Sequence, residues 1–275
     1  MDRRRACRSL PLLLPNASTV EPDGFCADCH GIVNLRSRSH AAPSAKDCSV
    51  QPLYTLPKIE RPALLVVDMQ NDFVRAGAPF EVPAAQETIP SQQRLVGAFR
   101  EHDLLVVFLQ WVGIENDPYQ RMQDKFTWAR GLADDIKGCR PGHLRYYEDI
   151  EADRDCCAII DELTPTADEI QLTKRGYGAF LGTALDSILR DRNIDGVIIT
   201  GVMSECCVED TARQAYQLHY PAVVIKDAVA TYDPRATATM LDVVDKNFGW
   251  VADTITVIDW LDAARGGSVL PPLPT

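Results

Sequence analysis

The sequence lacks a long hydrophobic run and an excess of basic charge. No segment approaches the roughly 20 consecutive apolar residues that a membrane-spanning helix needs, and the apolar stretch from Leu10 to Leu14 is short and broken by Pro11. Acidic residues outnumber basic ones by 39 to 28, which gives a net charge of −11. Because binding to phosphates requires a basic face, these absences predict a soluble protein that acts on a small molecule and binds neither membrane nor nucleic acid.

A regular disulfide pattern is also missing, although the chain has nine cysteines. Two cysteine pairs are adjacent in the sequence, Cys156 with Cys157 and Cys206 with Cys207. Disulfide-stapled secreted domains usually have an even number of cysteines at regular spacing. We therefore expect a reducing, cytoplasmic compartment. A disulfide within the first 57 residues remains an alternative.

The first 57 residues lack the sustained periodicity of helices and strands. They are expected to form an N-terminal extension of low order, so the folded domain should span residues 58–275. Within the extension, Cys26-Ala27-Asp28-Cys29-His30 matches the C-x-x-C-H pattern of haem attachment and contains potential metal ligands. One short motif is a weak signal, and haem or zinc binding there is kept only as an alternative.

The rest of the chain alternates between short apolar runs and segments with helical spacing. The apolar runs predict six strands: Ala63–Val67, Leu104–Leu109, Glu169–Thr173, Gly196–Thr200, Ala222–Lys226 and Thr254–Ile258. The helical segments are Ser91–His102, Gly182–Arg192, Cys206–Leu218 and Arg235–Phe248. This alternation predicts an α/β fold of three layers, Rossmann-like, with a six-stranded parallel sheet flanked by helices on both faces. Residues 110–148 fit neither pattern and are interpreted as a lid or an oligomer contact.

Three potentially reactive side chains follow predicted strands. Asp68 follows the first strand, Lys174 follows the third, and Cys207 lies in the turn after the fourth. Ligands of open parallel sheets bind at the carboxyl ends of strands, so we expect these groups to share a crevice. Burial there would raise the pKa of Asp68 toward that of a general base, and a helix N-terminus would favour the thiolate of Cys207. Taken singly, the three residues could instead be a turn cap, a solvated lysine and a buried apolar residue.

Three sequence blocks resemble those of the isochorismatase-like cysteine hydrolases. The blocks are Leu64–Phe73, Thr173–Thr183 and Gly201–Ala215, and their order and spacing match that family over about residues 60–262. The resemblance implies a catalytic triad of Asp68, Lys174 and Cys207, with no cofactor. It also distinguishes Cys207 from its neighbour Cys206, because the family's nucleophile directly precedes a valine.

The resemblance has further implications for the site. It implies a cis peptide between Val202 and Met203, with N–H groups of Met203 and Cys207 stabilising an oxyanion. Some family members bind a metal through histidines after the second strand. No histidine lies between His102 and His143 here, so we expect no metal. The expected substrate-binding walls are Phe73, Trp111, Tyr177 and Phe180.

The function that these features predict is hydrolysis of a C–N bond in a small amide, ureide or carbamoyl compound through a thioester. The resemblance also implies a homo-oligomer, a dimer or a tetramer. Ser204, in the same turn as Cys207, is a second candidate nucleophile. Two other functions remain as alternatives: a vinyl-ether hydrolase of the isochorismate type and a non-catalytic binding module. The departures from the commoner family pattern at Gly176, Gly178 and Glu205-Cys206 leave the substrate open.

Overall fold

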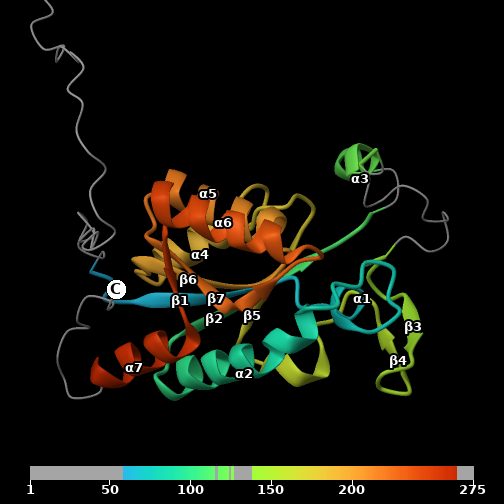
Figure 1. The fold of residues 1–275 in the computed structure, drawn as a ribbon, viewed down its shortest axis with the longest axis horizontal. Helices are drawn as coiled ribbons and strands as arrows, with labels where there is room; N and C mark the ends of the chain where they lie inside the picture. Colours follow the sequence, from blue (N-terminus) through green and yellow to red (C-terminus); the bar gives the residue numbers. More distant parts are fainter. Residues whose placement is uncertain (1–57, 115–116, 124, 127–137, 265–275) are drawn as a thin grey trace, which may run out of the picture. The chain divides into compact units, whose positions relative to one another are not determined.

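The structure, a computed structural model, describes residues 58–114, 117–123, 125–126 and 138–264 (Figure 1). The predicted extension of residues 1–57 lies outside the described residues, as do residues 265–275. Among the described helices, none is both long and apolar enough to cross a membrane.

Six parallel strands form the central sheet, which confirms the predicted fold class. Their order is β5-β2-β1-β6-β7-β8. Both β1 and β6 are buried along their whole length, which explains why their sequences read as continuous apolar runs. The strands are β1 Pro62–Val67, β2 Leu105–Trp111, β5 Ile170–Lys174, β6 Gly196–Val202, β7 Ala222–Ala230 and β8 Trp250–Ala252.

Helices cover both faces of this sheet (Figure 1). One face packs against α2 (Ala85–Glu101) and α7 (Thr254–Ala264), and the other against α4 (Leu185–Asp191), α5 (Glu209–Gln217) and α6 (Pro234–Asn247). Successive side chains of a strand point to opposite faces. In β1 this alternation sends Leu64 and Val66 into the core beneath α2 and α7, and the alternate residues Leu65 and Val67 into the core on the other face.

Smaller elements lie beyond the carboxyl ends of the strands. The short helix α1 (Asn71–Val74) follows β1, and an antiparallel hairpin of β3 (Leu144–Tyr147) and β4 (Ala152–Asp155) lies beside it (Figure 1). The remaining elements are the helix α3 (Pro118–Gln123), the 3₁₀ turn η2 (Asp161–Leu163) and the π-helical turn η3 (Ser204–Val208).

The predicted strand Thr254–Ile258 was wrong, because these residues begin helix α7 and the edge strand is Trp250–Ala252. Val257, Trp260 and Leu261 are buried at helical spacing, whereas the first five residues alone do not separate a strand from a buried helix. Helix α2 also begins at Ala85 and continues through Pro90, where the sequence predicted a later start.

The interpretation of residues 110–148 as a segment outside the core was wrong at its two ends. Trp111 completes β2 and Tyr147 belongs to β3, and both are among the largest fully buried side chains. Much of the intervening sequence, including residues 127–137, lies outside the described residues. A lid or an oligomer contact in that part stays a prediction.

Gly201 allows the backbone of β6 to approach the backbone of β1 closely. Its φ is +110°, and an added Cβ would lie 2.0 Å from the carbonyl oxygen of Val67. We expect Gly201→Ala to lower the free energy of unfolding by at least about 3 kcal/mol, measured by urea denaturation. Gly97→Ala is the matched control: Gly97 lies in α2 with open space around it, so alanine should stabilise the protein by about 0.5–1 kcal/mol. Equal stabilities of the two variants would contradict the close strand contact.

Candidate active site

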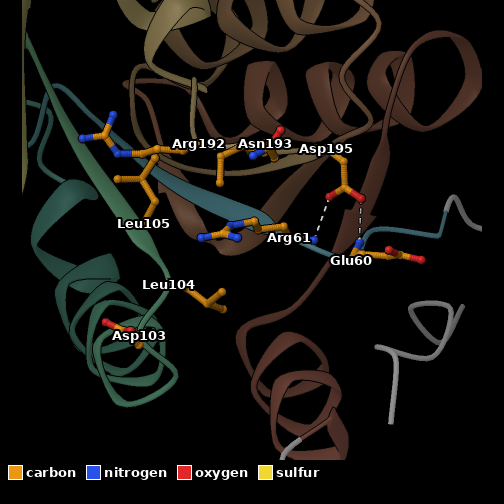
Figure 2. Close-up of a pocket in the computed structure, with 9 residues that line it drawn as sticks. Glu60, Arg61, Asp103, Leu104, Leu105, Arg192, Asn193 and Asp195 are labelled. Carbon is orange, nitrogen blue, oxygen red and sulfur yellow. Dashed lines mark hydrogen bonds between the residues drawn. The ribbon is translucent and has the colours of Figure 1, made fainter. Parts of the chain in front are cut away.

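The amino ends and the carboxyl ends of the sheet's strands carry different residues and different chemistry. At the amino ends of β1, β2 and β6 lies a pocket of about 780 Å³ (Figure 2). The carboxylate of Asp195 at this edge accepts the backbone N–H groups of Glu60 at 2.9 Å and Arg61 at 2.8 Å (Figure 2). The reactive residues predicted from the sequence lie at the opposite edge, so this pocket is not part of their site.

At the carboxyl ends of the strands, the sheet has a topological switch point between β1 and β6. These neighbouring strands divide the sheet into two halves, with β2 and β5 on one side and β7 and β8 on the other. Such a division leaves a crevice at the carboxyl ends of the two central strands. Asp68 directly follows β1, and Cys207 lies in η3, which follows β6. Lys174 is the last residue of β5, two strands away from β1.

Lys174 and Asp68 form a buried ion pair across the end of β2. Lys174 Nζ lies 2.7 Å from Asp68 Oδ2, and the two side chains are 0% and 1% exposed. Asp68 Oδ1 accepts the backbone N–H of Trp111 at 3.0 Å, and Lys174 Nζ also donates to the carbonyl of Gly176 at 3.3 Å. The alternative of a solvated strand-end lysine is therefore wrong, and the carboxylate is bonded to other segments of the chain.

Burial and charge shift the pKa values of this pair. Burial raises the pKa of Asp68 above its ordinary value, and the nearby Lys174 offsets only part of this effect. Burial alone would lower the pKa of Lys174, but the negative charge of Asp68 and the contact with Cys207 outweigh it, and the pKa of Lys174 is raised. Lys174 therefore remains a cation at neutral pH, while Asp68 is a stronger base than an exposed aspartate.

Cys207 completes the group of three. Its side chain is buried, and its thiol lies within hydrogen-bonding reach of both Asp68 and Lys174. The surroundings of Cys207 oppose the thiolate that the start of a helix was expected to favour. The hydrogen bond with Cys206 and burial raise the pKa of Cys207 well above its ordinary value, and these effects outweigh the attraction of Lys174. The raised pKa favours a neutral thiol next to the carboxylate of Asp68.

The turn that positions Cys207 has the cis peptide bond between Val202 and Met203 that the resemblance implied. The carbonyl of Met203 accepts the N–H groups of Cys206 and Val208, each at 3.1 Å. Thr211 Oγ1 donates to the carbonyl of Cys207 at 2.6 Å, which fixes the turn to the start of α5. The geometry of the turn is thus set by backbone and hydroxyl bonds on both sides of the thiol.

Ser204, the second candidate nucleophile, has different surroundings. Its hydroxyl is buried and accepts the hydroxyl of Thr237 at 3.0 Å. A threonine hydroxyl is neutral and cannot serve as a general base at physiological pH. The contacts of Ser204 are those of a structural residue in the turn.

The predicted substrate walls do not all lie together. Phe73 and Trp111 form an aromatic cluster with Phe80, with ring centroids 5.7–6.2 Å apart. Trp111 is adjacent to the ion pair, because its backbone N–H bonds to Asp68. Tyr177 is partly exposed and follows the Gly176 carbonyl that binds Lys174.

Phe180 lies in a different environment. Its ring stacks on Tyr220 at 5.9 Å and belongs to the core beneath α4, α5 and α6. The nearby Gly178 also has a packing role, because a Cβ there would lie 1.9 Å from the side chain of Gln214. Gln214 Oε1 accepts the N–H groups of Phe180 and Leu181 at 3.0 and 3.1 Å. The glycine thus makes room for a side chain that shapes the loop after Lys174.

Sequence reasoning missed two buried polar residues next to the first strand. Gln70 Oε1 accepts the N–H of Trp111 at 2.8 Å, and its Nε2 donates to the carbonyls of Trp111 at 2.9 Å and Cys157 at 3.0 Å. Asp72 accepts the hydroxyl of Tyr147 at 2.7 Å and Nε of Arg145 at 2.9 Å. The available signal was their place directly after a buried strand, within the sequence block Leu64–Phe73.

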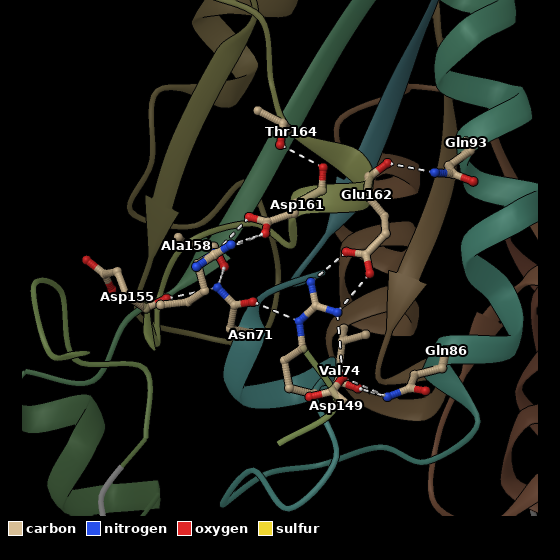
Figure 3. Close-up of polar contacts among 12 residues, drawn as sticks. Asn71, Val74, Gln86, Gln93, Asp149, Asp155, Ala158, Asp161, Glu162 and Thr164 are labelled. Atoms are coloured by element: carbon tan, nitrogen blue, oxygen red, sulfur yellow. Dashed lines mark hydrogen bonds and ion pairs between the residues drawn. The ribbon is translucent and has the colours of Figure 1, made fainter. Parts of the chain in front are cut away.

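A third buried polar residue, Arg75, fixes α1 to its surroundings, and Figure 3 shows its partners Asn71 and Glu162. Its guanidinium donates to both carboxylate oxygens of Glu162, at 2.8 and 2.6 Å, and to Asn71 Oδ1 at 3.2 Å. Asn71 in turn donates to the carbonyl of Asp155 at 3.0 Å. Bidentate arginine–carboxylate pairs are strong and directional, so this network holds α1 against η2 and the end of β4.

The chain is similar to a known protein family and to curated enzymes. The isochorismatase domain model matches residues 62–256. Ureidoacrylate amidohydrolase RutB of Serratia proteamaculans (strain 568) is 33% identical over 211 residues, which cover 73% of this chain and 83% of the relative. The chain belongs to the isochorismatase family.

Solved structures of this family share the fold. The isochorismatase-like hydrolase of Alkaliphilus metalliredigens is 28% identical with a TM-score of 0.61, and the match covers 72% of this chain and 98% of that one. The N-carbamoylsarcosine amidase of Thermoplasma acidophilum is 30% identical with a TM-score of 0.56, over 70% of this chain and 96% of that one. The isochorismatase fold therefore accounts for most of the described residues.

Cys206 should control how readily the neighbouring thiol of Cys207 is alkylated. Its hydrogen bond is the largest cause of the raised pKa of Cys207, so Cys206→Ala should lower that pKa. The thiolate fraction at neutral pH should rise, and the pH midpoint for alkylation of Cys207 by iodoacetamide should move to lower pH. Peptide mass spectrometry measures the rate across a pH series. Cys156→Ala is the control and should not move the midpoint; an unchanged or higher midpoint in Cys206→Ala would contradict the assignment.

Proposed function

We propose that this protein hydrolyses a C–N bond of a small amide, ureide or carbamoyl compound, with Cys207 as the nucleophile. The observation that supports this most directly is the buried contact of Asp68, Lys174 and Cys207 at the switch point of the sheet. A base, a fixed cation and a thiol within mutual reach are the groups that covalent hydrolysis of an amide requires.

The first half of the reaction forms a thioester. Asp68 takes the proton of Cys207 as the sulfur attacks the carbonyl carbon, and the positive charge of Lys174 stabilises the anions that form. The N–H groups of Met203 and Cys207 bind the oxyanion. When the tetrahedral intermediate collapses, the protonated Asp68 gives its proton to the leaving nitrogen, the C–N bond breaks, and an amine or ammonia departs.

The second half regenerates the thiol. Asp68 is ionised again and takes a proton from water, whose oxygen attacks the thioester carbon. The C–S bond breaks, the sulfur recovers the proton from Asp68, and the acid product leaves. The neutral resting thiol supports this sequence, because Asp68 then begins each cycle as the base and Lys174 stays charged throughout.

The names of the relatives indicate the first substrates to test. One relative is named for ureidoacrylate and one for N-carbamoylsarcosine. We propose ureides and N-carbamoyl compounds as the substrate class, with Phe73, Trp111 and Tyr177 as pocket walls. Phe180 contributes through packing against Tyr220.

The cellular setting is part of the same proposal. Five free cysteines, Cys139, Cys156, Cys157, Cys206 and Cys207, occur in the described part of the chain. Free thiols in this number support a reducing compartment such as the cytoplasm. The homo-oligomer, as a dimer or a tetramer, stays a prediction, as does activity without a cofactor.

Release of ammonia or amine from a panel of amides, ureides and carbamoyl compounds tests the proposed function. Wild type should hydrolyse at least one ureide or carbamoyl compound, Cys207→Ala should reduce release to background, and Cys206→Ala should retain it. Asp68→Asn, which keeps the shape of the side chain but removes the base, should lower kcat by about 10²–10⁴-fold. A silent wild type, or an active Cys207→Ala, would contradict the proposal.

A further inference from the structure

Three cysteine side chains from two separate segments meet near the candidate active site, and the proposed reaction does not use them. Cys139 precedes β3, and Cys156 and Cys157 follow β4. The thiol of Cys157 hydrogen-bonds with the thiols of both Cys139 and Cys156. All three residues are buried. Their sulfur atoms form one continuous group, which we call the thiol cluster.

Asp155 adds a carboxylate to the thiol cluster. The ligand atoms of Asp155, Cys156 and Cys157 all lie within 4.8 Å of one another. A tetrahedral zinc ion with Zn–S bonds of about 2.3 Å places its sulfur ligands about 3.8 Å apart. The spacing of these three ligand atoms is therefore near that of a metal site. Cys139 contacts Cys157 but lies outside this close group, so its thiol would have to move toward the ion to become the fourth ligand.

Hydrogen bonds outside the thiol cluster fix the segments that supply these ligands. The carboxylate of Asp155 accepts the N–H groups of Gly142 and Cys157, each at 2.8 Å, and every carboxylate oxygen keeps a further lone pair. The N–H of Cys139 donates to Asp72 Oδ2 at 2.8 Å. Metal-binding carboxylates in known sites are themselves hydrogen-bonded, which orients them for the ion. The segments that carry Cys139 and Asp155 are thus held in place before any ion binds, and a movement of the Cys139 side chain would close the site.

We propose that Cys139, Asp155, Cys156 and Cys157 bind one thiophilic divalent cation of the zinc class. Three thiolates and a carboxylate are a ligand set that such ions accept in tetrahedral sites. On binding, the three thiols lose their protons to solvent and the ion replaces them. The site is distinct from the position after β2, where some family members bind a metal and where the missing histidines predict none.

The bound ion would act on the neighbouring base through backbone contacts. The carbonyl of Cys157 accepts Nε2 of Gln70 at 3.0 Å. Gln70 Oε1 and Asp68 Oδ1 both accept the same N–H of Trp111. An ion that fixes Cys157 therefore also fixes the residues that orient Asp68, so its expected role is structural support of the site.

A cadmium titration of the full-length, reduced and metal-stripped protein tests the proposal. Cadmium–thiolate bonds absorb in the ultraviolet, and wild type should bind one equivalent that Cys139→Ala and Cys157→Ala each lose. Two controls should keep that equivalent: Cys206→Ala, and the double variant Cys26→Ser/Cys29→Ser, which removes the C-x-x-C-H motif. Loss of the absorption in a control variant, with no loss in the thiol-cluster variants, would overturn the proposal.

Two readouts on wild type do not depend on the folding of a variant. Zinc at 100 times its dissociation constant should raise the folded-to-unfolded ratio about 100-fold, seen as a higher Tm. Zinc should also slow alkylation of Cys139, Cys156 and Cys157 while leaving Cys207 unaffected. An unchanged Tm with unprotected thiols, or a Cys139–Cys157 disulfide in the protein as isolated without added reductant, would show that the thiol cluster is not a metal site.

Discussion

The buried ion pair between Lys174 and Asp68 is the interaction on which the candidate site depends. Moving two charges out of water costs several kcal/mol per ion, and this cost is recovered only when the geometry is good and the remaining bonds are satisfied. Here the N–H of Trp111 and the carbonyl of Gly176 satisfy those bonds. Removal of one partner would leave the other charge buried and unpaired, which would lower the free energy of unfolding by about 3–5 kcal/mol. The pair therefore requires β5, β2 and β1 to keep their register.

The surrounding loops keep that geometry in place. Gln70 fixes Trp111 next to the carboxylate, and Arg75 fixes the short helix that follows the first strand. Asp72 joins the same region to the β3–β4 hairpin through Tyr147. These are buried polar contacts between segments far apart in the sequence. They explain how loops at the carboxyl ends of the strands can position a thiol and a base.

The sequence predicts the fold well where burial is uniform. Central strands such as β1 and β6 are apolar throughout, and their limits were predicted to within two residues. The edge strand β8 is only partly buried, and the adjacent run at Thr254–Ile258 is apolar because it faces the core as a helix. The start of α2 was missed because Pro90 does not end that helix.

The sequence predicted the reactive side chains of the site but not the contacts that surround and position them. Asp68, Lys174 and Cys207 could be named because each follows a strand and because the family blocks contain them. The protonation state of Cys207 could not, since it depends on the side chain of Cys206 and on burial. The placement of Phe180 away from the aromatic cluster depends on Tyr220, a contact that only the folded chain creates.

The measurement that most directly tests the central claim is acid quenching during turnover of the best substrate, followed by mass spectrometry of the Cys207 peptide. This peptide should gain the mass of the acyl or carbamoyl group and lose it again as substrate is exhausted. Product formation with an unmodified Cys207 peptide, or with the added mass on another residue, would contradict it.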